Sequence, residues 1–256
     1  MDFLTRIEKQ RYSRQILYPS WGGRAHHALK KASVFIAGAG GLGCPVMTCL
    51  AAAGVGCLRV CDQGEVEHSN LNRQILYSKS DLGTHKVVAA EKAVKRLNQS
   101  IRFEPLYESI DKRNIERLVA EAQLLIDCVD NFETRFVLNS YAVKEKIPLV
   151  HGGVSGFLGQ ITFVRTPNTP CLSCMIGAVE DSIGAFPIVG ATAGIIGSLQ
   201  ALEALKYLTG TGELLEGRIL FWDGERNRFH ISREERNPDC PVCAGTGPDY
   251  NMDISR

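Results

Sequence analysis

The stretch Val34-Phe-Ile-Ala37, followed at once by Gly38-Ala-Gly-Gly-Leu-Gly43, decides the fold. The apolar tetrapeptide predicts a buried strand, and the small-residue segment from Pro45 to Gly54 predicts a helix packed tightly on a sheet. Leu58-Arg-Val-Cys61 predicts a second strand that ends at Asp62. A glycine turn between strand and helix lets the backbone approach phosphate at the helix N-terminus. The stretch therefore predicts a nucleotide-binding unit built on Gly38, Gly40, Gly41, Gly43 and Asp62.

Two basic residues follow this unit at positions that a dehydrogenase would not need. Ser69-Asn-Leu-Asn-Arg-Gln74 contains Arg73, and Asp81-Leu-Gly-Thr-His-Lys86 ends at Lys86. Arginine offers a forked set of donors and lysine a point charge, a combination suited to phosphates that must be held and then released. We therefore expect a triphosphate rather than a dinucleotide. The alternative is that both are solvated surface cations.

An acidic residue follows a third predicted strand. Leu124-Leu-Ile-Asp-Cys128 is an apolar run of central-strand type, and Val129-Asp130-Asn131 comes directly after it. Ligands of open α/β sheets lie outside the carboxyl ends of the strands. We therefore expect Asp130 to be a magnesium ligand or a carboxylate near the ribose. The alternative, compatible with the first, is an N-cap for a helix from Glu133 to Lys146.

Four cysteines form two C-x-x-C pairs, Cys171-Leu-Ser-Cys174 and Cys240-Pro-Val-Cys243. Four thiolates in two such pairs suit a structural tetrahedral zinc site that joins distant segments of chain. A redox pair and buried free thiols are the alternatives. The other five cysteines lie in apolar segments and are expected to fill the core: Cys44, Cys49, Cys57, Cys61 and Cys128.

The whole pattern predicts an α/β fold with a Rossmann-like nucleotide-binding sheet, parallel in its N-terminal half, with antiparallel strands added C-terminally and helices on both faces. We expect one domain over 1–243 and a disordered tail over 244–256. The expected parts of the domain are a helical segment (1–32), the nucleotide-binding core (33–150) and a zinc-stapled part (151–243). Within them we expect a first helix over 4–17, hairpin strands over 148–150 and 157–164, a long helix over 191–207 and a last hairpin over 218–232. His151 is expected to be a satisfied interior residue without a role, and Gly194 and Gly197 to permit close helix packing.

Composition excludes several classes of partner. The 29 basic and 28 acidic residues nearly cancel, so no nucleic-acid or membrane partner is expected. The charged N-terminus does not have the pattern of a signal peptide, and no apolar run has transmembrane length. We therefore expect a cytoplasmic protein, in which cysteines are reduced.

These motifs, in this order, resemble the bacterial MoeB/ThiF/HesA adenylyltransferases, relatives of the ubiquitin-activating enzymes, from about Arg11 to Cys243. The resemblance implies ATP-dependent adenylation of the C-terminal glycine of a small ubiquitin-fold sulfur carrier of ThiS or MoaD type, ending in Gly-Gly, with release of pyrophosphate. It implies ATP, Mg²⁺ and Zn²⁺ as cofactors. Thiamin, molybdopterin and amino-acid routes all fit. The motifs that carry it are Arg11-Tyr-Ser-Arg-Gln15, the glycine loop, Ser69–Gln74, Lys86, Asp130-Asn131, Gly159-Gln160, both cysteine pairs and Gly197–Glu203.

The resemblance also implies roles for single residues. Asp62 would bind the ribose hydroxyls, Arg73 and Lys86 the phosphates, and Asp130 magnesium. Arg14 would reach the ATP of a partner subunit, which implies a homodimer with Arg14 acting in trans. The implied catalytic set is Arg14, Arg73, Lys86 and Asp130. The implied nucleotide-binding set is Gly38, Gly40, Gly41, Gly43, Asp62, Ser69, Asn70, Arg73, Gln74, Lys86, Asp130 and Asn131.

Two features depart from the family pattern. Many relatives carry a second acid where this chain has Gly64, and Glu65 is the nearest substitute. Segment 179–185 contains no cysteine for a covalent link to the carrier, so we expect the reaction to stop at the acyl-adenylate, with sulfur supplied by another protein. The surrounding loop, 177–187, is expected to be mobile and to cover the carrier tail. An NAD-dependent oxidoreductase and a non-catalytic scaffold of the same fold are the competing hypotheses.

Overall fold

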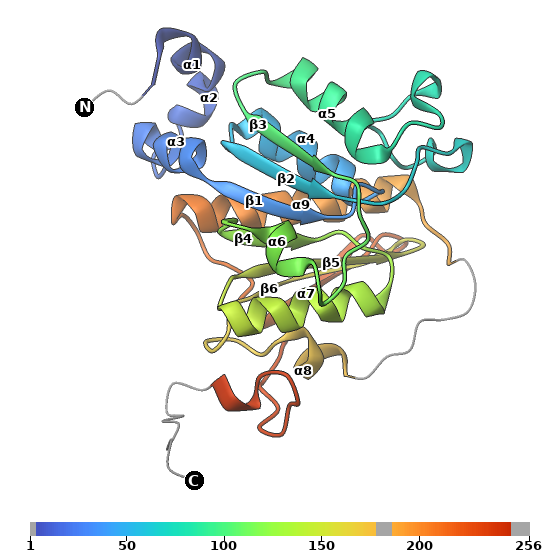
Figure 1. The fold of residues 1–256 in the computed structure, drawn as a ribbon. Helices are drawn as coiled ribbons and strands as arrows, with labels where there is room; N and C mark the ends of the chain where they lie inside the picture. Colours follow the sequence, from blue (N-terminus) through green and yellow to red (C-terminus); the bar gives the residue numbers. More distant parts are fainter. Residues whose placement is uncertain (1–3, 178–185, 247–256) are drawn as a thin grey trace.

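The computed structural model describes residues 4–177 and 186–246, and its centre is an eight-stranded sheet (Figure 1). The strand order is β3-β2-β1-β4-β5-β6-β7-β8. Strands β1 to β5 pair with one another in parallel, and β6, β7 and β8 continue the sheet from β5 in antiparallel pairing. The predicted fold class is thereby confirmed. The strands are β1 (Ser33–Ala37), β2 (Cys57–Cys61), β3 (Arg102–Leu106), β4 (Leu124–Asp127), β5 (Leu149–Ser155), β6 (Leu158–Val164), β7 (Arg218–Asp223) and β8 (Arg228–Arg233).

Helices cover both faces of the sheet, and each face has its own core. Alternate residues of a strand point to opposite faces, so Val34 and Ile36 enter one core while Phe35 and Ala37 enter the other. The first core packs under α3 (Gly22–Lys31), α4 (Gly43–Ala53), α5 (Lys86–Leu97) and α9 (Gly190–Thr209). The second packs under α6 (Ile115–Val119), α7 (Phe132–Glu145) and α8 (Leu172–Ile176).

The first predicted helix is two short helices, α1 (Arg6–Arg11) and α2 (Ser13–Ile16). The break is at Tyr12, whose φ and ψ of −97° and 12° leave the helical region. Tyr12 is buried, stacks on His26 with ring centroids 4.6 Å apart, and accepts a hydrogen bond from Asn98. This tertiary anchor redirects the chain, which helical periodicity alone cannot predict.

Helices α4 and α9 approach closely at one glycine. A Cβ at Gly197 would stand 2.6 Å from the Leu42 carbonyl oxygen and would overlap the Pro45 ring. The expectation of close packing is therefore correct for Gly197. A Cβ at Gly194 would meet nothing within 4 Å, so that glycine has no packing role among the described residues.

The C-terminal hairpins extend the sheet beyond the nucleotide-binding unit. Strand β5 is longer than predicted and continues to Ser155, so the turn to β6 is only Gly156-Phe157, with Gly156 at φ +56°. Of the predicted disordered tail, 244–246 form the short 3-10 helix η3 (Ala244–Thr246), and the rest lies outside the described residues. Most of the predicted mobile loop, 178–185, also lies outside them.

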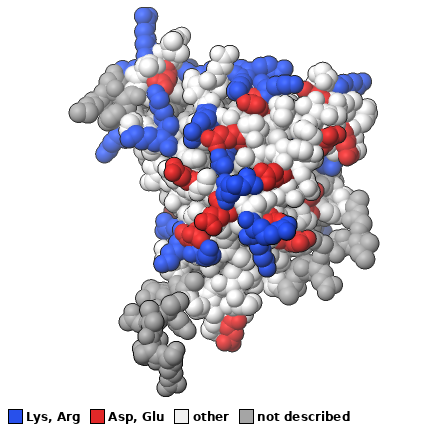
Figure 2. All heavy atoms as spheres, in the orientation of Figure 1, with Lys and Arg blue, Asp and Glu red and all other residues white. Residues whose placement is uncertain are grey.

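The visible surface carries both signs of charge, intermixed over one face of the molecule (Figure 2). This mixture agrees with a net charge of +1. Among the described helices, none is long and apolar enough to cross a membrane.

Candidate functional site

The glycine loop forms a tight turn between β1 and α4. Gly38 has a φ of +95°, and a Cβ there would stand 2.6 Å from the Cys128 carbonyl oxygen. A Cβ at Gly43 would overlap the Gly38 carbonyl oxygen. Both positions therefore exclude a side chain, and they bring the loop and the start of α4 close to the end of β4.

Asp62, directly after β2, holds the glycine loop in place. Its Oδ2 accepts a hydrogen bond of 2.8 Å from the Ala39 N–H, and its Oδ1 accepts one of 2.7 Å from the Gly64 N–H. The buried Tyr77 hydroxyl donates to the Ala39 carbonyl oxygen over 2.7 Å. Each carboxylate oxygen still has a lone pair available, so Asp62 can support the loop and accept hydrogen bonds from a ligand as well.

A cavity of about 970 Å³ lies at this edge of the sheet. Its lining begins at the glycine loop and Asp62, passes the segment after β4, and continues to Gly153 on β5, Gln160 on β6 and Phe221 on β7. It is thus an elongated site. One end has the features of a nucleotide site, and the other is bounded by the antiparallel strands.

Two basic side chains in the cavity lack an acidic partner. Arg73 lies against the glycine loop, with its Cγ 3.7 Å from the position of a Gly41 Cβ. Lys86 begins α5 and also lines the cavity. Within 4–177 and 186–246, neither forms an ion pair with a carboxylate. The third basic residue of the lining, Arg135, is paired with Asp127. The cavity therefore presents to an anion two cations that are not engaged in an ion pair with a carboxylate of the described residues.

The segment around Arg73 lines the cavity with some of its residues and stabilises the turn behind them with others. The Arg73 guanidinium donates to the Ser69 carbonyl oxygen over 2.9 Å and to the Asn72 side chain over 3.0 Å. Asn70 is buried, and its side chain accepts from the Glu67 N–H. The structure therefore places Arg73 and Gln74 in the lining, while Ser69 and Asn70 stabilise the turn behind them.

Gly64 adds no carboxylate of its own beside Lys86, although Asp62 is near, with its Oδ1 3.1 Å from the position of a Gly64 Cβ. A Cβ at Gly64 would stand 3.1 Å from the Lys86 Nζ, so a carboxylate at this position would compete with a bound anion for that charge. Glu65 does not replace it, because its side chain lies 3.5 Å from His85 and is not part of the lining.

Asp130 lies in the cavity, although not at a strand end. Strand β4 stops at Asp127, and Asp130 is exposed at the start of the turn into α7. The residue that caps α7 is Asn131, whose side chain accepts from the Thr134 N–H over 2.8 Å. The N-cap alternative for Asp130 is therefore wrong. Its carboxylate is free to face a ligand, and an exposed carboxylate oxygen fits magnesium.

Gly40, Gly41 and Asn131 also line the cavity, and Gly43 lies behind the lining at the start of α4. Arg14, on α2, is not among the lining residues. The cavity thus collects Arg73, Lys86 and Asp130 from the implied catalytic set, and Arg14 remains outside it within one chain.

A buried ionic group beneath the cavity was not predicted. Asp127 is fully buried, and its Oδ2 accepts from Arg135 Nε over 2.9 Å and from His151 Nδ1 over 2.7 Å. Burial raises the pKa of Asp127, but the Arg135 charge and the His151 hydrogen bond outweigh it, and the pKa lies below its usual value. Burial lowers the pKa of His151 despite that bond. A signal was present in the sequence, since an aspartate in a central strand needs partners.

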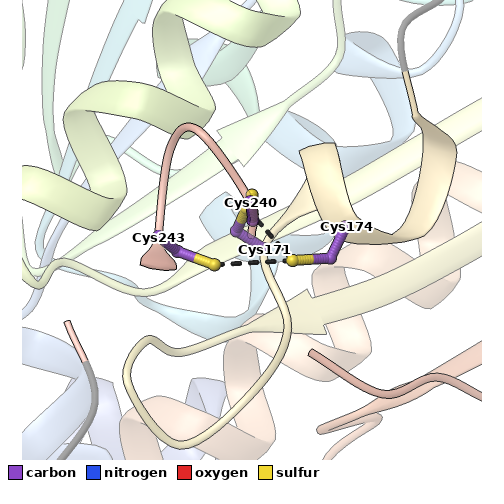
Figure 3. A group of neighbouring side chains, drawn as sticks. All are labelled: Cys171, Cys174, Cys240 and Cys243. Carbon is purple, nitrogen blue, oxygen red and sulfur yellow. Dashed lines mark hydrogen bonds between the residues drawn. The ribbon is translucent and has the colours of Figure 1, made fainter. Parts of the chain in front are cut away.

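The four cysteines of the predicted zinc site converge (Figure 3). Their Sγ atoms all lie within 4.8 Å of one another, with 3.7 Å from Cys171 to Cys240 and 3.4 Å from Cys174 to Cys243. Sulfurs bound tetrahedrally to zinc at about 2.3 Å lie about 3.8 Å apart, so the group could bind zinc. Burial raises the pKa of Cys240, but backbone N–H donors at Val242 and Cys243 outweigh it and bring the pKa to about 7, which favours a thiolate ligand.

Comparison with known proteins identifies the family. The model of the ThiF family matches residues 12–242. The chain is 40% identical to the SAMP-activating enzyme E1 of Haloferax volcanii, over 98% of this chain and 94% of that protein. It is 38% identical to a sulfur carrier protein adenylyltransferase of Thermus thermophilus, over 93% and 92%. It is also 38% identical to the adenylyltransferase and sulfurtransferase MOCS3 of Drosophila ananassae, but spans only 53% of that relative.

Solved structures share the fold. A crystal structure of E. coli MccB with ATP superposes with a TM-score of 0.83 at 25% identity, over 91% of this chain and 74% of that one. Another, of MccB with MccA-N7isoASN, gives a TM-score of 0.84 at 25% identity and the same coverage. The family model and the relatives agree with each other, and the chain belongs to the ThiF family.

Proposed function

We propose that the protein uses ATP to adenylate the C-terminal glycine of a small ubiquitin-fold sulfur carrier, with release of pyrophosphate. The observation that carries the proposal is a pair of cations, Arg73 and Lys86, that form no ion pair with a carboxylate of the described residues and line the same cavity as a glycine loop that excludes side chains. The names of the Haloferax and Thermus relatives support the substrate class. An NAD-dependent oxidoreductase would not need these cations.

The chemistry fits the residues present. The carrier's C-terminal carboxylate is ionised at neutral pH, so it can attack the α-phosphorus of ATP without a general base. One phosphorus–oxygen bond forms, the bond to the β-phosphate breaks, and pyrophosphate leaves. Arg73 and Lys86 would stabilise the charge that develops on the phosphates. Asp130 would hold Mg²⁺, which when bound neutralises phosphate charge.

Pyrophosphate exchange tests the function directly. With ATP, Mg²⁺ and a carrier ending in Gly-Gly, we expect exchange of labelled pyrophosphate into ATP, because adenylation is reversible. A carrier truncated by its last glycine is the matched control and should give none. Equal exchange with both carriers, or quenching of NADH fluorescence in place of ATP binding, would contradict the proposal.

We further propose a homodimer in which Arg14 serves the partner's nucleotide, because Arg14 lies outside the cavity of its own chain. Arg14→Ala and Asp130→Ala dimers should each be inactive. Mixing the two under conditions of subunit exchange should restore part of the pyrophosphate exchange, because a mixed dimer then contains one complete site. No recovery despite demonstrated subunit exchange would exclude action in trans.

A further inference from the structure

Beneath the cavity, a line of polar side chains leads from a buried charge to its surface. Asp127, at the end of β4, contacts His151 on the neighbouring strand β5. The other ring nitrogen, His151 Nε2, lies 3.2 Å from Nε2 of Gln160 on β6. Asp127 and His151 are buried, whereas Gln160 is partly exposed and lines the cavity. The line therefore ends at a group that a substrate can touch.

The chemistry of this line fixes the orientation of the Gln160 amide. Ionised Asp127 accepts only, so His151 must carry its proton on Nδ1 and donate it to the carboxylate. A neutral ring has no second proton, and Nε2 is then an acceptor. Gln160 must consequently turn its NH₂ group toward His151. Its carbonyl oxygen Oε1, which has no hydrogen-bond partner among the described residues, is left for the cavity.

Neighbouring residues keep space above this amide. Gly153 pairs with Gln160 across β5 and β6, and the Gln160 side chain lies over it, with Cγ and Nε2 both 3.4 Å from the position of a Gly153 Cβ. Leu158 and Phe221, both exposed and lining the cavity, stand on the adjoining strand positions. Gln160 is thus a polar group held in place beside two apolar side chains in this part of the cavity.

Position in the sheet indicates what lies over that group. The phosphate-binding loop follows β1, and Gln160 is on β6, three strand spacings away in the order β1-β4-β5-β6. At about 4.8 Å per spacing, that is about 14 Å, which is beyond the triphosphate. An extended polypeptide that brings its carboxylate to the α-phosphate would cross this part of the cavity.

We propose that Gln160 binds the main chain of the carrier's C-terminal tail, its Oε1 accepting a hydrogen bond from a peptide N–H, and that Asp127 and His151 hold it in this orientation. The proposal rests on the proposed function and adds a recognition residue to it. Gln160 thus acts on the second substrate, whereas Arg73 and Lys86 act on the first.

Separate titrations of the two substrates test the assignment. In Gln160→Ala, loss of one hydrogen bond of about 1–1.5 kcal/mol should raise the KM for the carrier about tenfold. The Kd for ATP, measured without carrier, should change less than twofold. Gln123→Ala, at an exposed position outside the cavity, is the matched control and should change neither. An unchanged carrier KM, or an equal loss of ATP affinity, would overturn the proposal.

The orientation of the Gln160 amide can be tested separately by spectroscopy. Two-bond proton–nitrogen correlation spectra of protein labelled with ¹⁵N-histidine should show the neutral His151 ring protonated at Nδ1, with assignment from a His151→Gln variant. Protonation at Nε2 would contradict the proposed orientation of the Gln160 amide. If wild type shows no carrier-dependent pyrophosphate exchange, the proposed function fails. If wild type shows it but Gln160→Ala retains the wild-type KM, only this inference fails.

Discussion

Lys86→Ala or Arg73→Ala should slow adenylation at least ~10²-fold, the loss typical of removing one preorganised charge-stabilising donor. Both cations line the same cavity as the glycine loop and form no ion pair with a carboxylate in the described part of the chain, so their charge is available to the phosphates. Charge that is fixed before the reaction stabilises the transition state without reorganisation. The rate of carrier-dependent pyrophosphate exchange measures the effect.

A matched control is present on the same helix. Lys92 lies on α5 with Lys86 but is exposed and outside the cavity, so Lys92→Ala should keep the wild-type rate. Arg73→Lys should recover part of the lost rate, because it restores the charge but not the forked donors that also contact Ser69 and Asn72. Near-normal exchange in either alanine variant would mean that the phosphates bind elsewhere.

The strand, turn and helix at the start of the sheet could be predicted from sequence because the information is local. The strand, glycine loop and helix from Val34 to Gly54 are contiguous, and each element has its own pattern. The same holds for the two C-x-x-C pairs, whose metal-like spacing is visible before any fold is known. The structure confirms the fold class and brings the four thiols together.

What the sequence did not predict depends on contacts between distant segments. Asp127, His151 and Gln160 lie on three successive strands of the sheet, and only the order β4-β5-β6 makes them neighbours. The break at Tyr12 likewise depends on contacts with His26 and Asn98. At Asp127 and at Tyr12 the local sequence pattern is compatible with several structures. The buried polar group requires hydrogen-bond partners from distant segments, and this requirement determines which structure forms.

Loss of one of the four clustered cysteines is expected to lower the stability of the fold strongly, without a direct effect on adenylation. Sixty-five residues separate Cys174 from Cys240, so a metal here closes a long loop. The group is also tied to α7, since buried Asn139 accepts from the Leu172 N–H over 2.9 Å and donates to Ser173. Structural zinc contributes about 10 kcal/mol to small domains at neutral pH, which makes loss of one ligand a matter of several kcal/mol.

Cys240→Ser should therefore reduce bound zinc, measured by a chromogenic chelator after denaturation, and should lower the midpoint of thermal unfolding by many degrees. Cys49→Ser is the matched control, because Cys49 is partly buried but outside the group, and it should retain zinc. Below the unfolding transition, the Kd of Cys240→Ser for ATP should stay close to wild type, because the thiols do not line the cavity. A Cys240→Ser variant as stable and as zinc-replete as wild type would show that zinc bound by these four thiols does not stabilise the fold. A loss of ATP affinity in the folded variant would instead show that α7 transmits strain from the thiols to the turn that carries Asp130.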